Sequence, residues 1–187
     1  MEMGNTIIDK NIPRLQGKRI YLSLLRNDNE AIQKYMAWMS DETTCAFIEK
    51  NMEVVDYTMM PGWVCDDRVL RMGIVYKEND ELIGYCHIDY RSKQNVCWIS
   101  INIGDPSYRG KGIGSDVLDT LMNYSFKELN VESMHLDVLE DNQGAIRLYE
   151  TKGFIISGRY RAHGFHNGHR CDWLHMDILK DEYFGGR

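Results

Sequence analysis

The chain has 187 residues, 43% of them hydrophobic and 27% charged, and a formal net charge of −6, values ordinary for one globular domain. The negative charge argues against a nucleic-acid partner, which needs a basic surface, and suits a cationic substrate. Five cysteines without a CxxC pair, no cleavage signal and no apolar run of roughly 20 residues lead us to expect a cytoplasmic protein without a membrane partner.

The first half of the chain predicts one strand, two helices and a run of three strands. Alternating apolar residues indicate a strand over 18–25, and Asn27 and Asp28 can cap a helix over about 30–39. A second helix is expected between 53 and 64. Three β-strands are expected next, over 71–76, 82–90 and 95–103.

The second half begins with the strongest helix signal of the chain, an apolar stripe at helical spacing over about 112–129. A strand over 134–139 and a helix over 142–152 follow. The last strands, 154–164 and 171–179, are expected to form a hairpin around Asn167-Gly168, because this dipeptide favours a two-residue turn. The order βαα-βββ-α-β-α-ββ predicts an α/β fold with a mixed sheet in a single domain, residues 1–187.

A glycine-rich turn, Arg109-Gly110-Lys111-Gly112-Ile113-Gly114, links a predicted strand to the helix expected over 112–129. Glycines let a backbone approach a ligand closely, and a helix N-terminus offers free N–H donors and a partial positive charge. Together these features suit a phosphate or pyrophosphate. The spacing fits neither GxxxxGK[ST] nor GxGxxG, so we exclude a P-loop and a dinucleotide-binding turn. A plain glycine loop without a ligand is the structural alternative.

At this turn the sequence resembles a known family. Arg109-x-x-Gly112-x-Gly114 matches the [Q/R]-x-x-G-x-[G/A] signature of the GNAT acyltransferase superfamily. Residues 142–154 (NQGAIRLYETKGF) are similar to that family's N-x-x-A-x-x-x-Y-x-x-x-G-F segment, and residues 168–172 (GHRCD) resemble the G-x-x-x-D hairpin of its RimJ/RimL-like branch. The resemblance covers about 18–179, the expected core of one acyl-CoA N-acyltransferase domain.

The resemblance implies a central, mostly antiparallel twisted sheet that splays at the cofactor site, with helices on both faces. It implies that acetyl-CoA is the acyl donor, that the glycine turn holds the CoA pyrophosphate, and that the strand before it pairs with the pantetheine arm. Asn142 would contact the pantetheine. The cofactor-binding residues implied in this way are Ile101, Ile103, Arg109, Gly110, Lys111, Gly112, Ile113, Gly114, Ser115, Asn142 and Tyr149.

The resemblance also implies a catalytic role for Tyr149, which would lie beside the sulfur. A tyrosine hydroxyl there can protonate the leaving thiolate, and a backbone N–H of the splayed strand can stabilise the oxyanion. The alternative is a core tyrosine on an amphipathic helix. Many relatives carry a glutamate base where this chain has Trp98.

The general base therefore stays open. The candidates are a water held by Ser100 or Asn102, and the carboxylates of Asp105 and Glu140. Acidic residues on loops are more often solvated than catalytic.

We expect an N-acetyltransferase that moves an acetyl group to a primary amine of a small molecule, with no metal. The alternatives are acetylation of protein N-termini and a non-catalytic acyl-CoA sensor. Whether the chain forms a homodimer stays open.

His163, His166 and His169 form an HxxHxxH string, but in a hairpin His163 and His166 should face opposite sides. In similar proteins the region of Trp38, Phe47 and Trp63 lines the acceptor pocket.

Overall fold

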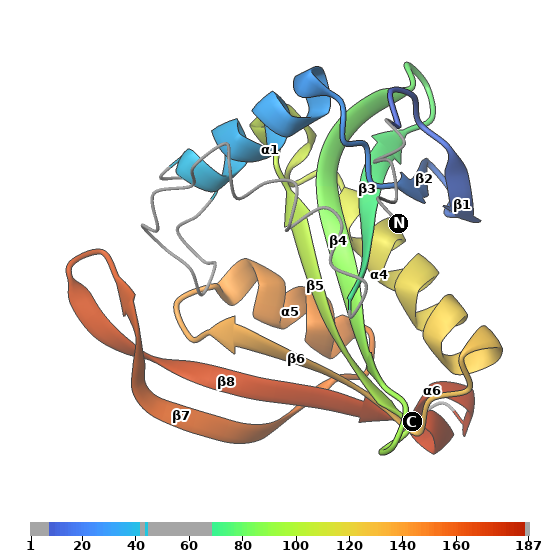
Figure 1. The fold of residues 1–187 in the computed structure, drawn as a ribbon. Helices are drawn as coiled ribbons and strands as arrows, with labels where there is room; N and C mark the ends of the chain where they lie inside the picture. The colour runs from blue at the N-terminus through green and yellow to red at the C-terminus, as the bar shows by residue number, and fades with distance from the viewer. Residues whose placement is uncertain (1–7, 42–43, 45–68, 186–187) are drawn as a thin grey trace, which may run out of the picture.

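The computed structural model describes residues 8–41, 44 and 69–185, which form a mixed α+β fold around one eight-stranded sheet (Figure 1). The strand order is β1-β2-β3-β4-β5-β6-β8-β7, and every neighbouring pair is antiparallel except β5 and β6. The strands are β1 (Pro13–Gln16), β2 (Ile20–Leu24), β3 (Leu70–Tyr76), β4 (Glu81–Arg91), β5 (Val96–Ile103), β6 (Ser133–Leu139), β7 (Ile155–His166) and β8 (His169–Leu179).

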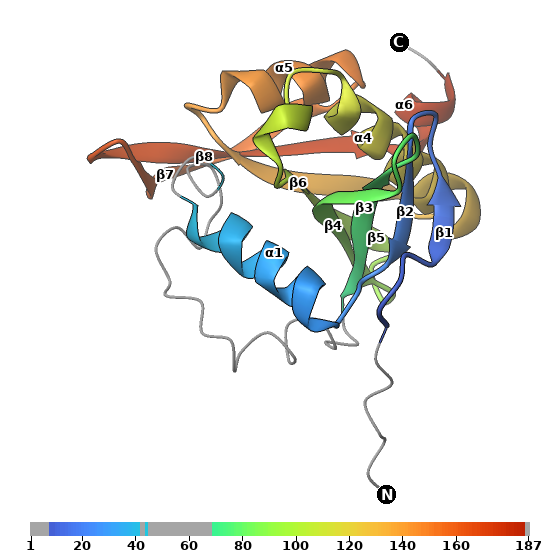
Figure 2. The same ribbon diagram turned by 90° about the horizontal axis from the view of Figure 1, so that it is seen from above.

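Helices cover both faces of the sheet (Figure 2). The helices are α1 (Asn29–Ser40), α4 (Ile113–Asn123), α5 (Gln143–Thr151) and α6 (Lys180–Gly185). On one face α1 buries Ile32 and Tyr35 against the sheet residue Tyr85. On the other face, buried residues of α4 and α5 form one core with alternate residues of the strands. Val117 of α4 and Leu136 of β6 both belong to this core. The buried clusters follow the predicted apolar stripes.

The predicted hairpin is confirmed at its turn. Asn167 and Gly168 both have positive φ, 48° and 80°, and His166 pairs with His169 across them. Positive φ at both turn positions gives the twist that joins right-handed strands, and Asn and Gly tolerate it. The local residue types therefore determined this turn.

Three departures from the predicted elements have local reasons. The strand β1 was not predicted, because its four residues begin with Pro13 and proline has a low β-propensity. The proline is tolerated because β1 is an edge strand, where the missing N–H costs no ladder hydrogen bond. The helix α4 ends at Asn123 and widens into a turn in which Leu129 N–H donates to Tyr124 O at 3.0 Å. The short α6 was not predicted, and the helix expected over 53–64 lies outside the described residues.

The sheet opens between its two parallel strands. Register pairs join Val96 to Ser133 and Trp98 to His135, and the pairing stops there. Beyond this point β5 keeps its pairing with β4 as far as Ile103, whereas β6 continues against β8. Figure 1 shows β5 and β6 diverging. Residues 99–103 therefore have a strand neighbour on one side only, as the splayed sheet requires.

None of the helices in the described ranges combines the length and apolar character that a membrane crossing requires.

Candidate functional site

The glycine turn presents its backbone to solvent at the start of α4. Gly110 and Gly112 have φ of 69° and 75°, and Gly112 occupies the N-cap position, where no side chain caps the helix. Both glycines and Lys111 between them are exposed. The first N–H groups of a helix have no carbonyl four residues earlier within it, so they point outward with the positive end of the helix dipole. The turn has the geometry of an anion site.

Arg109 fastens this turn to the end of β5. Its Nε donates to Ile103 O at 2.9 Å, and its Nη2 donates to Gly104 O at 3.0 Å and to Thr44 Oγ1 at 2.7 Å. The guanidinium therefore fixes the position of the backbone that leads into the turn. A direct contact of Arg109 with a cofactor stays a prediction.

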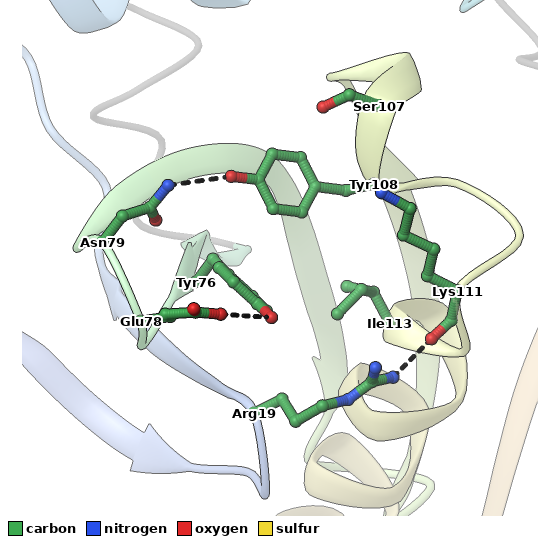
Figure 3. A pocket seen from close by; sticks show the side chains of 8 residues that line it. All are labelled: Arg19, Tyr76, Glu78, Asn79, Ser107, Tyr108, Lys111 and Ile113. Carbon is green, nitrogen blue, oxygen red and sulfur yellow. Dashed lines mark hydrogen bonds between the residues drawn. The ribbon is translucent and has the colours of Figure 1, made fainter.

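Arg19 is a turn-supporting residue that the sequence analysis missed. Its Nη2 donates to Lys111 O at 2.6 Å, and a Cβ at Gly112 would lie 3.1 Å from the same nitrogen. Figure 3 shows Arg19, the residue before β2, reaching to the turn at the wall of a cavity of about 570 Å³. A lone arginine 92 residues away carried no sequence signal for this role.

The walls of that cavity are polar and come from both sides of the turn. Tyr76 donates to Glu78 Oε2 at 3.1 Å, and Asn79 donates to the Tyr108 hydroxyl at 2.9 Å. The lining residues are Arg19, Tyr76, Glu78, Asn79, Ser107, Tyr108, Lys111 and Ile113. The cavity gives the turn open space on its β2–β3 side.

Asp116, in the first turn of α4, holds the helix against the sheet. Its carboxylate accepts the backbone N–H groups of Lys18 at 2.8 Å, Arg19 at 2.6 Å and Ile20 at 3.3 Å. The side chain is buried, with 7% of the residue exposed. An acidic residue in a first helical turn is expected from the helix dipole, but these partners were not visible in the sequence. Asp116 thereby positions the glycine turn.

The second segment of the resemblance lies close to the turn. A Cβ at Gly114 would be 3.5 Å from Leu148 Cδ2 of α5, so the end of the first motif lies beside the middle of the second. Asn142 caps α5, because its Oδ1 accepts Ala145 N–H at 3.1 Å. For the predicted contact with pantetheine, Asn142 therefore has its NH₂ group and the second lone pair of Oδ1.

Tyr149 follows Leu148 on α5 and is half-buried against the core. Its ring lies 5.8 Å from that of Phe154. Burial raises the pKa of the Tyr149 hydroxyl to about 12, so the phenol keeps its proton at neutral pH. A protonated hydroxyl beside a leaving thiolate can donate, which is the chemistry that the predicted role requires.

Trp98, at the position where relatives carry a base, stacks on His135 with ring centroids 4.6 Å apart. An indole has no lone pair that can accept a proton. Further along β5, Asn102 donates to the Tyr85 hydroxyl at 3.4 Å, and its buried Oδ1 has no hydrogen-bond partner among the described residues. Of the groups considered on this strand, Asn102 offers an acceptor and Trp98 does not.

The other two base candidates already have partners. Asp105 Oδ1 accepts Ser107 N–H at 2.8 Å and so caps the turn that follows β5. Glu140 binds Arg159 at 2.9 Å and accepts Asp172 N–H at 2.8 Å. These contacts indicate that both carboxylates stabilise the local fold.

The histidine string does not gather into one cluster. His166 Nδ1 and His169 Nε2 lie 2.9 and 3.2 Å from the same oxygen, Asp141 Oδ2. His163 is exposed, and its ring lies 5.9 Å from that of Tyr160 instead.

The predicted acceptor residues are described only in part. Trp38 packs against Gly104, next to the end of β5, which places α1 over the open strand. Phe47 and Trp63 lie outside the described residues.

Comparison with known proteins agrees with this geometry. The Acetyltransferase (GNAT) family matches residues 32–154. An uncharacterized N-acetyltransferase, p20, from Bacillus licheniformis is 30% identical over 62% of this chain and 65% of its own length. Spermidine N(1)-acetyltransferase of Vibrio cholerae is 35% identical over 42% of this chain and 45% of its own. The chain thus spans less than two thirds of the length of these two relatives.

The fold itself recurs among solved structures. A crystal structure of spermidine N-acetyltransferase from Vibrio cholerae in complex with CoA and spermine has a TM-score of 0.78 at 21% identity, covering 89% of this chain and 98% of that one. With the glycine turn, the splayed parallel pair and the family match over most of its length, the chain belongs to the GNAT family of acetyltransferases.

Proposed function

We propose that this protein transfers the acetyl group of acetyl-CoA to a primary amine of a small cationic molecule of the polyamine type. The observation that carries the proposal is the opening between β5 and β6 beside the glycine turn. An unpaired strand edge can hydrogen-bond an extended amide-containing arm as a further strand would, while the helix start holds a pyrophosphate. CoA contains both groups.

In the proposed reaction the neutral amine attacks the thioester carbonyl directly in a ternary complex. The C–N bond forms, the C–S bond breaks, and the sulfur takes the Tyr149 proton while the amine loses one to a base. Backbone N–H groups at the open edge of β5 stabilise the oxyanion. With Trp98 unable to accept a proton, we assign the base to a water held by Ser100 or Asn102, whose Oδ1 has no described partner.

Two observations favour a polyamine as the acceptor. Proteins named spermidine N(1)-acetyltransferase, from Vibrio cholerae and Escherichia coli, are among the relatives, at 35% and 29% identity. The net charge of −6 gives the molecule a field that attracts a polycation. The RimJ/RimL-like hairpin motif favours a second candidate, acetylation of protein N-termini. In this chain Asp172 of that motif binds Arg159 at 2.6 Å and Ala162 N–H at 2.7 Å, a structural role.

The test is release of free thiol from acetyl-CoA with a panel of acceptors, with the products identified by mass. The panel holds spermidine, spermine, an amino sugar, an amino-acid amide and peptides with free N-termini. We expect mono-acetylated polyamine as the main product. Turnover with peptides alone would replace the polyamine by the N-terminal candidate. Tight CoA binding without turnover of any acceptor would make the protein an acyl-CoA sensor and refute the proposal.

A further inference from the structure

A cluster of two histidines and an aspartate lies at the point where the sheet begins to open. His135 is the last residue of β6 that pairs with β5, and its partners on β8 are Asp177, directly across, and His175, two residues away. His135 Nδ1 faces His175 Nε2 at 3.2 Å, and Asp177 Oδ2 lies 4.0 Å from His135 Nδ1. The donor atoms of all three side chains lie within 4.8 Å of one another.

These side chains lie on the face of the sheet opposite α4 and α5. Leu136 and Met176 alternate with them along β6 and β8 and belong to the core under those helices. The two imidazoles and the Asp177 carboxylate are largely but not fully buried, with 16–17% of each side chain exposed. The cluster is therefore open to solvent on one side, so that an ion can reach it.

The outer nitrogen of each imidazole is already held. His175 Nδ1 lies 2.7 Å from Asp137 Oδ1, and because a carboxylate only accepts, this nitrogen carries the proton. A neutral His175 then directs the lone pair of Nε2 at His135. His135 Nε2 lies 2.6 Å from Ser133 Oγ, a hydroxyl that can either donate or accept. His135 can therefore hold its proton on either nitrogen.

The two tautomers of His135 define two states of the cluster. With the proton on Nδ1, the histidines form a simple hydrogen bond. With the proton on Nε2, donated to Ser133, two nitrogen lone pairs face each other and need a cation between them. A neutral imidazole with its proton on the outer nitrogen is the form that coordinates a metal through the other nitrogen.

The separation of the two imidazole nitrogens fits a tetrahedral ion. Metal–nitrogen bonds of about 2.0–2.1 Å at a tetrahedral angle place two nitrogens about 3.3–3.4 Å apart. The measured separation of His135 Nδ1 and His175 Nε2 is 3.2 Å. Asp177 has to close the 4.0 Å distance to His135 by about 0.6 Å, a rotation of one short side chain, to become the third ligand.

We propose that His135, His175 and Asp177 bind one divalent transition-metal ion of the zinc class, with a solvent molecule in the fourth position. Asp137 and Ser133 orient the two imidazoles, as partners of the outer nitrogens do in metal sites. The ion joins β6 to β8 beneath Trp98, at the apex of the opening between β5 and β6. The site is separate from the glycine turn and does not depend on the proposed acetyl transfer.

The test begins with metal-free, full-length protein titrated with Zn²⁺ by calorimetry and with Co²⁺ by visible absorption. We expect one equivalent to bind, with the strong ligand-field bands of tetrahedral Co²⁺. A saturating excess of Zn²⁺, about 100 times the dissociation constant, should raise the unfolding midpoint by about 5–10 °C. Because Trp98 stacks on His135 at 4.6 Å, Co²⁺ should also quench its fluorescence, and Trp98→Phe should remove this quenching while the absorption bands persist.

Variants separate this site from its alternatives. His135→Gln and His175→Gln should each weaken binding by at least about 100-fold, and Asp177→Asn by about 10–100-fold. The matched control is His169→Gln, which removes an exposed histidine that also contacts an aspartate, Asp141 at 3.2 Å. It should bind like wild type. If a ligand variant does not fold, quenching of Trp98 in the wild type still reports the location.

Three results would overturn the proposal. The first is no binding to the wild type, which would leave a hydrogen-bonded histidine pair. The second is loss of binding in His169→Gln but not in His135→Gln. The third is a thiolate charge-transfer band with Co²⁺, which would place the ion at cysteines instead.

Discussion

Tyr149 is the residue whose hydroxyl the proposed reaction uses. Since burial raises its pKa to about 12, the phenol stays protonated across the usual assay range. We expect Tyr149→Phe to lower kcat by about 100-fold with little change in the KM for acetyl-CoA, because the lost proton donation matters only in the transition state. Steady-state kinetics on acetyl-CoA and spermidine measure this.

The control for that variant is Tyr183→Phe. Tyr183 also packs on the core, and its hydroxyl donates to Asn123 at 2.8 Å, away from the open strand. Its kcat should match the wild type. An unchanged kcat in Tyr149→Phe would refute the role of general acid and leave Tyr149 a core residue.

His87, on β4 opposite Ser100, carries a pH dependence of stability. Burial, reinforced by the nearby charge of Arg71, lowers its pKa from 6.5 to about 4. The unfolded chain therefore binds the proton more tightly, so this contribution to stability is complete above pH 6.5 and is lost as the pH falls towards 4. We expect a loss of about 2 kcal/mol over that window after allowance for partial exposure.

Urea unfolding of the wild type and His87→Gln between pH 4 and 7.5 measures this loss. The variant should show a flatter dependence of the unfolding free energy on pH. The exposed His163→Gln should keep the wild-type slope. Parallel slopes for His87→Gln and the wild type would contradict the assignment to His87.

At the scale of elements, the glycine turn and the hairpin turn can be compared directly, because each contains a glycine at a similar positive φ. Gly112 and Gly168 have φ of 75° and 80°, and an L side chain in this region costs about 1–2 kcal/mol. Only at Gly112 does a Cβ meet a neighbour, Arg19 Nη2 at 3.1 Å. We expect Gly112→Ala and Gly168→Ala to lower the unfolding midpoint similarly, whereas only Gly112→Ala raises the KM for acetyl-CoA, by about tenfold.

Thermal unfolding and kinetics on both variants check this difference. An equal rise of KM in the two variants would trace the effect to general destabilisation, and no rise in either would remove the turn from the cofactor site.

At the scale of the whole molecule, one buried carboxylate joins distant segments of the chain. Asp116 accepts three successive backbone N–H groups from residues 18–20, almost a hundred positions earlier in the chain. Asp116→Asn replaces one acceptor oxygen by an NH₂ group that faces these donors. We expect it to lower the unfolding free energy by about 1–3 kcal/mol.

Denaturant unfolding measures this cost. The control is Asp119→Asn, on the same helix, where a half-exposed carboxylate pairs with Lys152 at 2.6 Å and should contribute less than about 1 kcal/mol. Equal losses in the two variants would show that Asp116 acts only as another charge on α4.

The sequence by itself determined the features whose causes are local. Glycines at positive φ, the apolar stripe of α4 and Asn167-Gly168 predicted the turn, the helix and the hairpin, because backbone preference and side-chain period act over a few residues. Only the tertiary structure decided which distant side chains meet. Arg19 reaches Lys111 and Asp116 accepts the N–H groups of residues 18–20 because α4 packs against β2. His135 faces His175 because the register of β6 and β8 brings the two together. Register is a property of the whole sheet, and its long-range pairs leave no mark on the sequence beside either partner.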